Sequence, residues 1–596
     1  YSNFSDALIG LDGIPNTSDD GLIHESGMPT NGLDGTTTYG PGTKLFGGGA
    51  YRVRILNNED DPGGSLMDTD QILLLQSTGL LGIYKKTVLY FLQANMVSFS
   101  PFARAPLVAE KKMKIGKECL ITAIDSALTK TILEQIMDGD YLYRGNLYSQ
   151  GKITVATGNT IQGDILSSAK AEEGAVDIDK NVEVSGNIFT EAGDIFLQEG
   201  VSISGKIATN QGTVINGTEG SVQEEQILEE VPTQISPLPL MDYENLYDKL
   251  RESQNGGSLT EIPSPSPPES AQVPFTNIFS DVTYSGGSRA LGSVGTSTLY
   301  YFDSLNMKNG ATLNLLGEVT IIVKNKFDIN NPNTRIISTG NVTFIVGKYE
   351  QHDGTSLQVT GNFNLQASHS EEGDICINGT TTISGNASII AEDKMEFASK
   401  SVLSIGGDAT VAAMEDEVRL SGSATFNGNT TIDAGEGVRF KADASGQGAE
   451  GNYTFNGNLT VDALNDIKIE NKTTLVLNGT ENYFFAEDNV EVKHGATLLN
   501  LDPSRFFIYA WGEDPDVIIN LDEDSGPIGV AVFAPNGDVE VGTSGSSDND
   551  TVIGALVGRS IRTAKGSKIF YDKNLDDFGP TTPVFFGYTV VAYKSY

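Results

Sequence analysis

Residues 385–426 read GNASIIAEDKMEFASKSVLSIGGDATVAAMEDEVRLSGSATF, and this stretch decides the fold. Its apolar residues fall in three short segments, ASI, MEF and LSI, in which every second side chain is apolar. The same three segment types return as ATV, VRL and ATF, 22, 23 and 21 residues further on. Alternation of this kind predicts short β-strands with one buried face, and the fixed period predicts a structural repeat.

The repeat extends in both directions from this stretch. Three series of paired apolar positions stay in step between about residues 340 and 492, with one long interval of 29 residues before Leu459. The first series is Val342/Phe344, Phe363/Leu365, Ala387/Ile389, Ala409/Val411, Thr430/Ile432 and Leu459/Val461. The second is Met395/Phe397, Val418/Leu420, Val438/Phe440, Ile467/Ile469 and Val490/Val492, and the third is Leu403/Ile405, Ala424/Phe426, Tyr453/Phe455 and Leu475/Leu477.

Three strands in each unit of about 22 residues are typical of one turn of a coil. We therefore expect an all-β chain built on a three-sided, right-handed parallel β-solenoid. Helices would need apolar residues at i, i+3 and i+4, and hairpins would not produce one repeat with three strand types. The extra residues of the long interval, ASGQGAEG at 444–451, predict a surface loop at a corner of the coil.

The remaining sequence suggests five segments. Weaker copies of the repeat precede a Glu-, Pro- and Ser-rich stretch, and Gly-punctuated strands follow the main array. We expect an antiparallel β head with acidic loops at 1–100, a first solenoid block with a short helical or irregular entry at 101–217, an acidic linker with a short helix (241–252) at 218–275, the main solenoid at 276–575, and a cap or interface strand at 576–596.

Asparagine recurs beside the corner glycines and has two interpretations. Turn chemistry, with Asn in a left-handed or side-chain-bonded conformation, is favoured over glycosylation of the Asn-x-Ser/Thr sites that the repeat creates. These sites include Asn341, Asn386, Asn429, Asn458 and Asn478.

The composition narrows the range of partners. The chain has 39 Lys and Arg against 78 Asp and Glu, a formal net charge of −39. This charge repels phosphate backbones and anionic lipids, so we expect no nucleic-acid partner, and no apolar run is long enough to span a membrane. A solvated acidic surface explains the charge without any ligand.

The metal-binding and nucleophilic residue types are sparse. The two cysteines, Cys119 and Cys376, are expected to be free and buried, and four scattered histidines (His24, His352, His369, His494) have no ligand spacing. Enzymes built on solenoids need clustered carboxylates and a basic residue on one face. Outward charges do stack here, but a salt-bridged face explains them, so no enzymatic activity is expected. They are Lys394, Glu396, Arg419, Arg439, Lys468 and Glu491.

Two acidic loops near the amino terminus are the ligand candidates. Carboxylate and amide oxygens in a Gly-containing turn suit a calcium ion, although neither loop has the EF-hand spacing and polar turns without an ion remain an alternative. The candidate ligands are Asp12, Asn16, Asp19 and Asp20 in the first loop and Asn57, Asp60, Asp61, Asp68 and Asp70 in the second.

Residues 41–92 predict an antiparallel meander of the strands YRVRIL, ILLLQSTG and KKTVLYFL. This region resembles PilX-type pilus assembly proteins, relatives of type IV minor pilins, and the rest resembles their bactofilin-like, polymer-forming β-helix. One departure is that residues 1–40 contain no apolar helix of the kind such pilins place in the membrane and then in the pilus core. The matching residues are Tyr51, Val53, Ile55, Asn57, Asn58, Asp60, Asp61, Asp68, Asp70, Ser77, Thr78 and Gly79.

The repeat and the resemblance together favour a structural protein at the cell surface or outside the cell. It would be the subunit of a filament, through self-association, or a pilus-associated component with a surface or glycan target. A polysaccharide-binding or polysaccharide-cleaving β-helix is the alternative, and a cytoplasmic bactofilin-like scaffold is a third and less favoured hypothesis.

Overall fold

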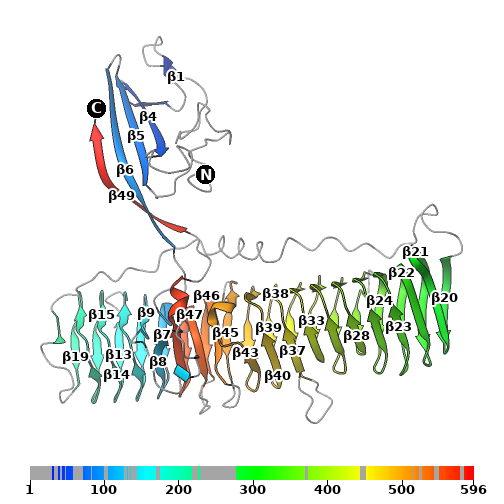
Figure 1. Cartoon of the computed structure of the whole chain (residues 1–596). Helices are drawn as coiled ribbons and strands as arrows, with labels where there is room; N and C mark the ends of the chain where they lie inside the picture. Colours follow the sequence, from blue (N-terminus) through cyan, green and yellow to red (C-terminus); the bar gives the residue numbers. More distant parts are fainter. Residues whose placement is uncertain are drawn as a thin grey trace. The chain divides into compact units, whose positions relative to one another are not determined.

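The structure, a computed structural model, describes residues 105–577 except 126–130, 132–133, 136–141, 143, 170–174, 218–225, 229–276, 369–372, 443–450, 513, 522–525 and 543–549. It also gives the strands, as backbone, between 30 and 98 and at 583–595. The chain divides into two compact units, 1–99 with 581–596 and 100–580. The larger unit is a parallel β-solenoid, which Figure 1 shows as a row of stacked coils.

Each regular coil contributes three strands, and each strand pairs in parallel with the third strand after it. The pairs form three ladders, A, B and C, that run along the stack. Ladder A contains β28 (Thr380–Ile383), β31 (Val402–Ile405), β34 (Ser423–Phe426), β37 (Gly451–Phe455) and β40 (Thr473–Leu477). Ladder B contains β29 (Ala387–Ala391), β32 (Ala409–Ala413), β35 (Thr430–Ala434), β38 (Leu459–Ala463) and β41 (Asn482–Ala486). Ladder C contains β27 (Ile375–Ile377), β30 (Met395–Phe397), β33 (Val418–Leu420), β36 (Val438–Phe440), β39 (Ile467–Ile469) and β42 (Val490–Val492).

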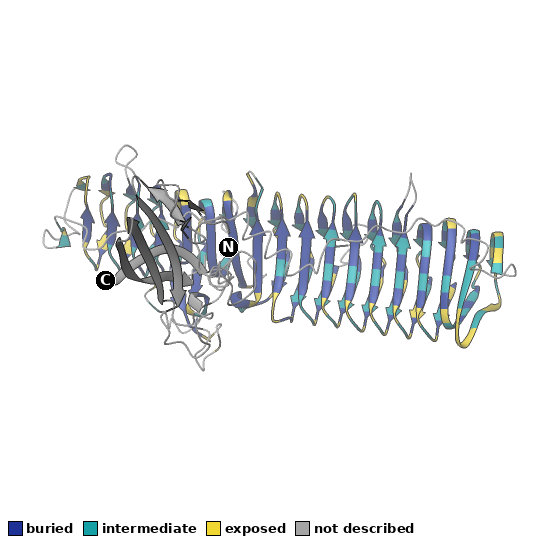
Figure 2. Ribbon diagram, turned by 90° about the horizontal axis from the view of Figure 1, so that it is seen from above, coloured by how far each residue is buried: buried dark blue, intermediate teal, exposed yellow. Residues whose placement is uncertain are grey.

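The register confirms the repeat that the sequence predicted. Phe397 lies opposite Leu420, Leu420 opposite Phe440 and Phe440 opposite Ile469 along ladder C. All four side chains are buried in one core that extends along the whole stack. Figure 2 shows the alternation of buried and less buried residues along these strands. The strand phase also resumes after residues 443–450, because β37 pairs with β34 in register.

Longer or shorter strands of the same kind lie before and after these regular coils. Before β27 lie β20 (Ile278–Ser285), β21 (Ser288–Lys308), β22 (Thr312–Ile329), β23 (Arg335–Ser338), β24 (Val342–Gln351), β25 (Ser356–Val359) and β26 (Phe363–Ala367). After β42 follow β43 (Thr497–Leu499), η3 (Pro503–Arg505), β44 (Phe506–Ala510), β45 (Asp516–Ile519), β46 (Ile528–Val541), β47 (Thr551–Thr563), β48 (Lys568–Asp572) and η4 (Lys573–Asp577). η3 and η4 are short 3₁₀ helices of three and five residues.

The amino-terminal block also belongs to this stack. Its strands are β7 (Leu107–Ile115), β8 (Leu120–Ile124), β9 (Leu147–Ser149), β10 (Lys152–Val155), β11 (Thr160–Ile161), β12 (Ile165–Ser167), β13 (Val176–Ile178), β14 (Glu183–Val184), β15 (Ile188–Thr190), β16 (Ile195–Leu197), β17 (Ser202–Ile203), β18 (Ile207–Thr209) and β19 (Val214–Asn216).

We expected two solenoid blocks separated by a linker, and the structure instead joins them in one 42-stranded sheet. β7 pairs in parallel with β47, and β8 pairs in parallel with β48. The order along the stack is therefore β20 to β48 and then β7 to β19. We call the β47/β48–β7/β8 contact the seam. Residues 217–277 connect the two opposite ends of a single rod, and the helix expected at 241–252 lies outside the described residues.

Backbone and side-chain contacts close the seam. Leu120 N–H donates to Ser567 O at 3.1 Å, and Gly566 N–H donates to Lys117 O at 2.8 Å. The Cys119 thiol is buried there and donates to Ala564 O at 3.1 Å. Within the described part of the rod the seam therefore has the same backbone pairing as any other layer contact.

From β41 onward, ladder B and its continuation carry apolar side chains at outward positions too, which simple alternation did not predict. Phe485, Phe507, Tyr509 and Phe533 occupy outward positions of ladder B and its continuation, yet all four are buried. They pack in a second cluster with residues near the seam, including Leu575 of η4. The outward face of this part of the rod is therefore buried within that cluster.

The smaller unit contains an antiparallel sheet in the order β3-β4-β5-β6-β49, and its strands overlap the predicted meander. A separate two-stranded pair is β1 (Thr30–Asn31) with β2 (Thr38–Tyr39). The sheet strands are β3 (Thr43–Phe46), β4 (Gly49–Asn57), β5 (Ile72–Leu81), β6 (Tyr84–Ser98) and β49 (Pro583–Ser595). We expected residues 576–596 to cap the last coil or form an interface. The structure shows that β49 pairs with β6, and that β7 and β8 cover the coil ending at β48.

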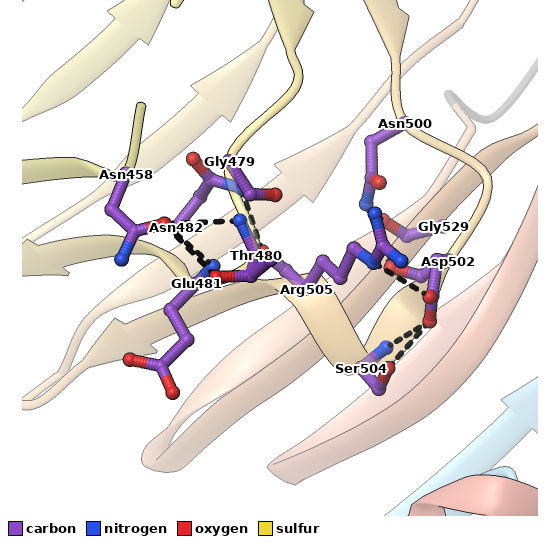
Figure 3. Close-up of polar contacts among 10 residues, drawn as sticks. All are labelled: Asn458, Gly479, Thr480, Glu481, Asn482, Asn500, Asp502, Ser504, Arg505 and Gly529. Carbon is purple, nitrogen blue, oxygen red and sulfur yellow. Dashed lines mark hydrogen bonds and ion pairs between the residues drawn. The ribbon is translucent and has the colours of Figure 1, made fainter. Parts of the chain in front are cut away.

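One corner of the coil is built from stacked Gly-Asn and Gly-Asp pairs. The side-chain oxygen of each Asn or Asp accepts the backbone N–H of its counterpart in the next layer, as in Asn458 N–H to Asn429 Oδ1 at 3.1 Å. At Asn458 the same oxygen accepts the N–H groups of Thr480 and Glu481 (Figure 3). The series runs through Asn341, Asn362, Asn386, Asp408, Asn429 and Asn458. The side-chain-bonded turn is the geometry we expected of this asparagine.

The glycine of each pair is required because successive layers approach closely. A Cβ added at Gly428 would lie 2.5 Å from Gly407 C and 2.6 Å from Asp408 N, which are backbone atoms of the layer below.

We predict that Gly428→Ala destabilises the rod by about 1–3 kcal/mol, the range for overpacking a site that cannot yield. Thermal unfolding followed by circular dichroism measures the effect. Thr431→Ala, on the outward face of the adjacent strand, is the control and should unfold within a degree or two of the wild type. Equal stability of the two variants would contradict the close approach at this corner.

Candidate functional site

The outward positions of ladder C form a column of charged side chains. Its register begins Asp328, Glu350, Cys376, Glu396 and Arg419 in successive layers. Alternate residues of a strand point to opposite faces, so the apolar neighbours of these residues point into the core. Parallel pairing places consecutive members of the column about 4.8 Å apart, within range of strong interaction.

The first two layers of this column gather three groups that could bind a metal ion. His352 Nε2 lies 2.9 Å from Asp328 Oδ1 and 3.6 Å from Glu350 Oε2. Each of these three residues offers one possible ligand atom, and the three atoms lie within 4.8 Å of one another. No second group of three or more His, Cys, Asp or Glu residues among the described residues meets this distance. The arrangement depends on the register, because Asp328 and Glu350 are direct partners on β22 and β24 and His352 follows β24 immediately.

Two lysines already compensate the charge of these carboxylates. Lys326 Nζ lies 2.5 Å from Glu350 Oε2 and 3.7 Å from Asp328 Oδ1. Lys348 Nζ lies 3.7 Å from Glu350 Oε1 and 3.3 Å from Asp374 Oδ2. An imidazole and two carboxylates suit zinc, but a metal ion would have to displace the Lys326 ammonium from Glu350. As it stands, the group is a surface ion-pair network on the rod.

Sequence reasoning missed this group. His352 had been set aside because no ligand lies at a standard spacing from it, whereas its partner Asp328 is 24 residues earlier. That separation is about one turn of the coil. The repeat length could therefore have revealed the pair, had outward residues been compared one turn apart.

Cys376 occupies the next outward position and is half-buried, not buried as we expected. Burial and the nearby Glu396 and Glu350 carboxylates raise the pKa of its thiol to about 11. The thiol is therefore protonated near neutral pH, which disfavours it as a metal ligand or nucleophile beside His352. The thiol of Cys119, at the seam, also has its pKa raised by burial.

The predicted stack of outward charges is present, with opposite charges one layer apart at Glu396/Arg419 and Lys468/Glu491. Like charges meet in the layers between these pairs. Arg419 lies opposite Arg439, and Arg439 opposite Lys468. Glu417, in the turn before β33, binds Arg419 and also Arg439 Nε at 3.1 Å, and it lies 3.9 Å from Lys394. For Arg419 and Arg439 the compensating carboxylate of Glu417 thus comes from the turn beside the column.

The calcium ligands suggested by the sequence cannot be placed. Asn57 ends β4, and its side chain lies outside the described residues. The same is true of Asp12, Asn16, Asp19, Asp20, Asp60, Asp61, Asp68 and Asp70. The calcium assignment therefore stays a prediction.

A family model described as a domain of unknown function (DUF7305) matches residues 407–578, from the middle of the rod to η4. No curated protein matches the chain. One solved structure, the competence-associated pilin ComZ from Thermus thermophilus, aligns over 96% of this chain and 87% of its own at 10% identity, with a TM-score of 0.20. In the described part of the chain, no helix has the length and hydropathy required for a membrane span.

The raised thiol pKa has a measurable consequence. A shift from 9.0 to about 11 lowers the thiolate fraction at pH 8 about 100-fold, so alkylation of Cys376 by iodoacetamide should be slower by about that factor than for an unperturbed thiol. The measurement uses the Cys119→Ser variant, which leaves one thiol, and follows the rate from pH 7 to 11.5. Glu396→Gln should speed the reaction because it removes a negative charge beside the thiol. A rate equal to that of a free cysteine would contradict the assigned environment.

Proposed function

We propose that this chain is a structural protein of the cell surface or extracellular space, a rigid subunit of a filament or of a pilus-associated assembly. The observation that carries the proposal is the continuity of the rod: one parallel sheet of 42 strands surrounds one apolar core. Backbone hydrogen bonds run along the rod axis from layer to layer. Bending or stretching the rod would therefore have to strain the hydrogen bonds between its layers. A three-sided, right-handed winding of this rod is part of the proposal.

The ends of the sheet support a role in assembly. Among the described strands, β20 pairs with β21 alone, and β19 pairs with β16 alone. Ile278 on β20 and Ile215 on β19 are 44% and 42% exposed. A strand with one free edge is a template for pairing with another chain, and the paired strands within each ladder run in the same direction. Subunits stacked end to end would therefore keep the parallel pairing.

The outer face gives less support to carbohydrate cleavage. The carboxylates in and beside the charged column, such as Glu350 and Glu417, already bind a neighbouring lysine or arginine. Catalytic carboxylates of glycosidases act as an acid and a base beside an open sugar-binding groove. We accordingly propose no enzymatic activity, and a pilin-like role for the head remains part of the proposal on the strength of the sequence resemblance at 47–79.

Electron microscopy of the purified chain tests the proposal. We predict rods that join into filaments or bundles in negative stain as the protein concentration rises, with and without 5 mM calcium as separate arms. A chain with Ile278→Asp and Ile215→Asp is the matched variant, because charged residues at a sheet edge oppose edge-to-edge pairing. Dispersed monomers of the wild type at every concentration in both arms would overturn the proposed role.

A further inference from the structure

We propose that two copies of the rod bind side by side, with a basic patch near the seam of one copy against an acidic ridge on the second copy. The inference rests on the proposed role as a structural subunit and names the surfaces that act laterally. It depends on a basic group and an acidic group, each of which contains charges that form no ion pair with another described residue.

The basic patch consists of Lys112, Lys114, Lys152 and Arg562 on the outward side of ladder C at the seam. Lys112 lies opposite Lys152 in the next layer, and Lys114 lies opposite Arg562 across the seam. Arg562 binds Glu540, and Lys152 lies 3.7 Å from Asp177. Lys112 and Lys114 are exposed, and neither makes an ion pair with a residue of the described chain.

The patch forms one wall of a shallow cavity of about 240 Å³. Lys112, Lys114 and Arg562 line it together with the Asp538 and Glu540 side chains. Like charges directly opposite one another in neighbouring strands are unfavourable, and the patch holds two such pairs, Lys112 with Lys152 and Lys114 with Arg562. An anionic group from outside would relieve this repulsion, and a chain of net charge −39 offers such groups in abundance on a second copy.

The acidic ridge lies at the corner that leads from ladder B to ladder C. Its members are Glu415, Asp416, Glu436, Glu487 and Asp488, which come from the turns before β33, β36 and β42. Backbone bonds stack these turns: Glu436 N–H donates to Asp416 O at 3.1 Å, Asn465 N–H to Glu436 O at 2.7 Å and Asp488 N–H to Asn465 O at 3.1 Å.

The carboxylates of the ridge face solvent. Glu415, Glu436, Glu487 and Asp488 are exposed and Asp416 is half-buried. None of them forms an ion pair with a described lysine, arginine or histidine, unlike Glu417 and Asp466 beside them. The ridge is thus a row of uncompensated negative charge on the rod.

The two surfaces fit one another in sign and in spacing. Both are built on layers about 4.8 Å apart, so charges along the patch and along the ridge are separated by multiples of one interval, although the ridge has no member in the layer of Asn465. Parallel or antiparallel alignment of two rods can therefore bring several opposite charges together at once. Contacts between exposed charges are screened over about 10 Å at 0.1 M salt, so the association should weaken as salt rises.

Charge-reversal variants test the pairing. Lys112→Glu with Lys114→Glu reverses the patch, and Glu415→Lys with Asp416→Lys reverses the ridge. We expect each variant alone to lose lateral association, measured by sedimentation velocity in 50 mM salt, with an apparent affinity at least about tenfold below that of the wild type. An equimolar mixture of the two variants should regain it, because each reversed surface then meets a complementary one.

The matched control reverses two lysines elsewhere on the rod, Lys308→Glu with Lys324→Glu, and so changes the net charge by the same amount. It should associate like the wild type, and 500 mM salt should dissociate both. All variants are first compared with the wild type by thermal unfolding, so that a folding defect is recognised.

The outcomes separate this inference from the proposed function. If the wild type forms filaments and the patch and ridge variants pack side by side as well as it does, the lateral pairing is wrong and the structural role stands. A mixture that fails to regain association also overturns the pairing. If the patch variant instead loses binding only to an added acidic polysaccharide, the patch serves a glycan and not a second copy. A wild type that stays monomeric throughout contradicts both.

Discussion

The rod depends on one constraint: each coil must present its backbone to the next coil at the spacing of a parallel sheet. That spacing, about 4.8 Å, determines which residues can occupy the corners and the interior. The corner glycines lie so close to the layer below that a methyl group would contact backbone atoms, as at Gly428. The neighbouring Asn or Asp turns the same proximity into a hydrogen bond between layers, as from Asn458 N–H to Asn429 Oδ1.

The same constraint explains how a chain can build one rod from two separated stretches. The last coil of any stack has strand edges without a partner. At β48 that edge pairs in parallel with β8, which comes from a distant part of the chain. Chain order and spatial order therefore differ, as in a circularly permuted repeat protein. The sheet of the smaller unit joins the same two chain segments. In the sequence β6 precedes β7, and β49 follows β48 and η4. β6 and β49 pair with each other. The two chain segments that meet at the seam thus also meet in a second sheet.

Local patterns predicted the strands and their register, since alternation and period are properties of neighbouring residues and of residues one turn apart. The stack of Phe397, Leu420, Phe440 and Ile469 follows from them. The seam could not be predicted in this way. The two blocks share one repeat pattern, and nothing in the sequence around Leu107 distinguishes a first coil from a coil that continues another. The burial of the outward side chains of Phe507 and Tyr509 was missed for a related reason. Some residues of the cluster in which they pack, such as Leu575, are distant from them in sequence.

The seam is the part of the account that a single measurement can test most directly. The Cys119 Sγ atom lies 3.5 Å from Thr563 Oγ1, although the two residues are 444 positions apart. In a Cys376→Ser background, Thr563→Cys should form a disulfide with Cys119 under mild oxidation. After cleavage at a protease site inserted between residues 229 and 276, the two fragments should migrate together on a denaturing gel without reductant and separately with it. Cys119→Ser in the same chain should abolish the link, and fragments that separate without reductant would contradict the continuous rod.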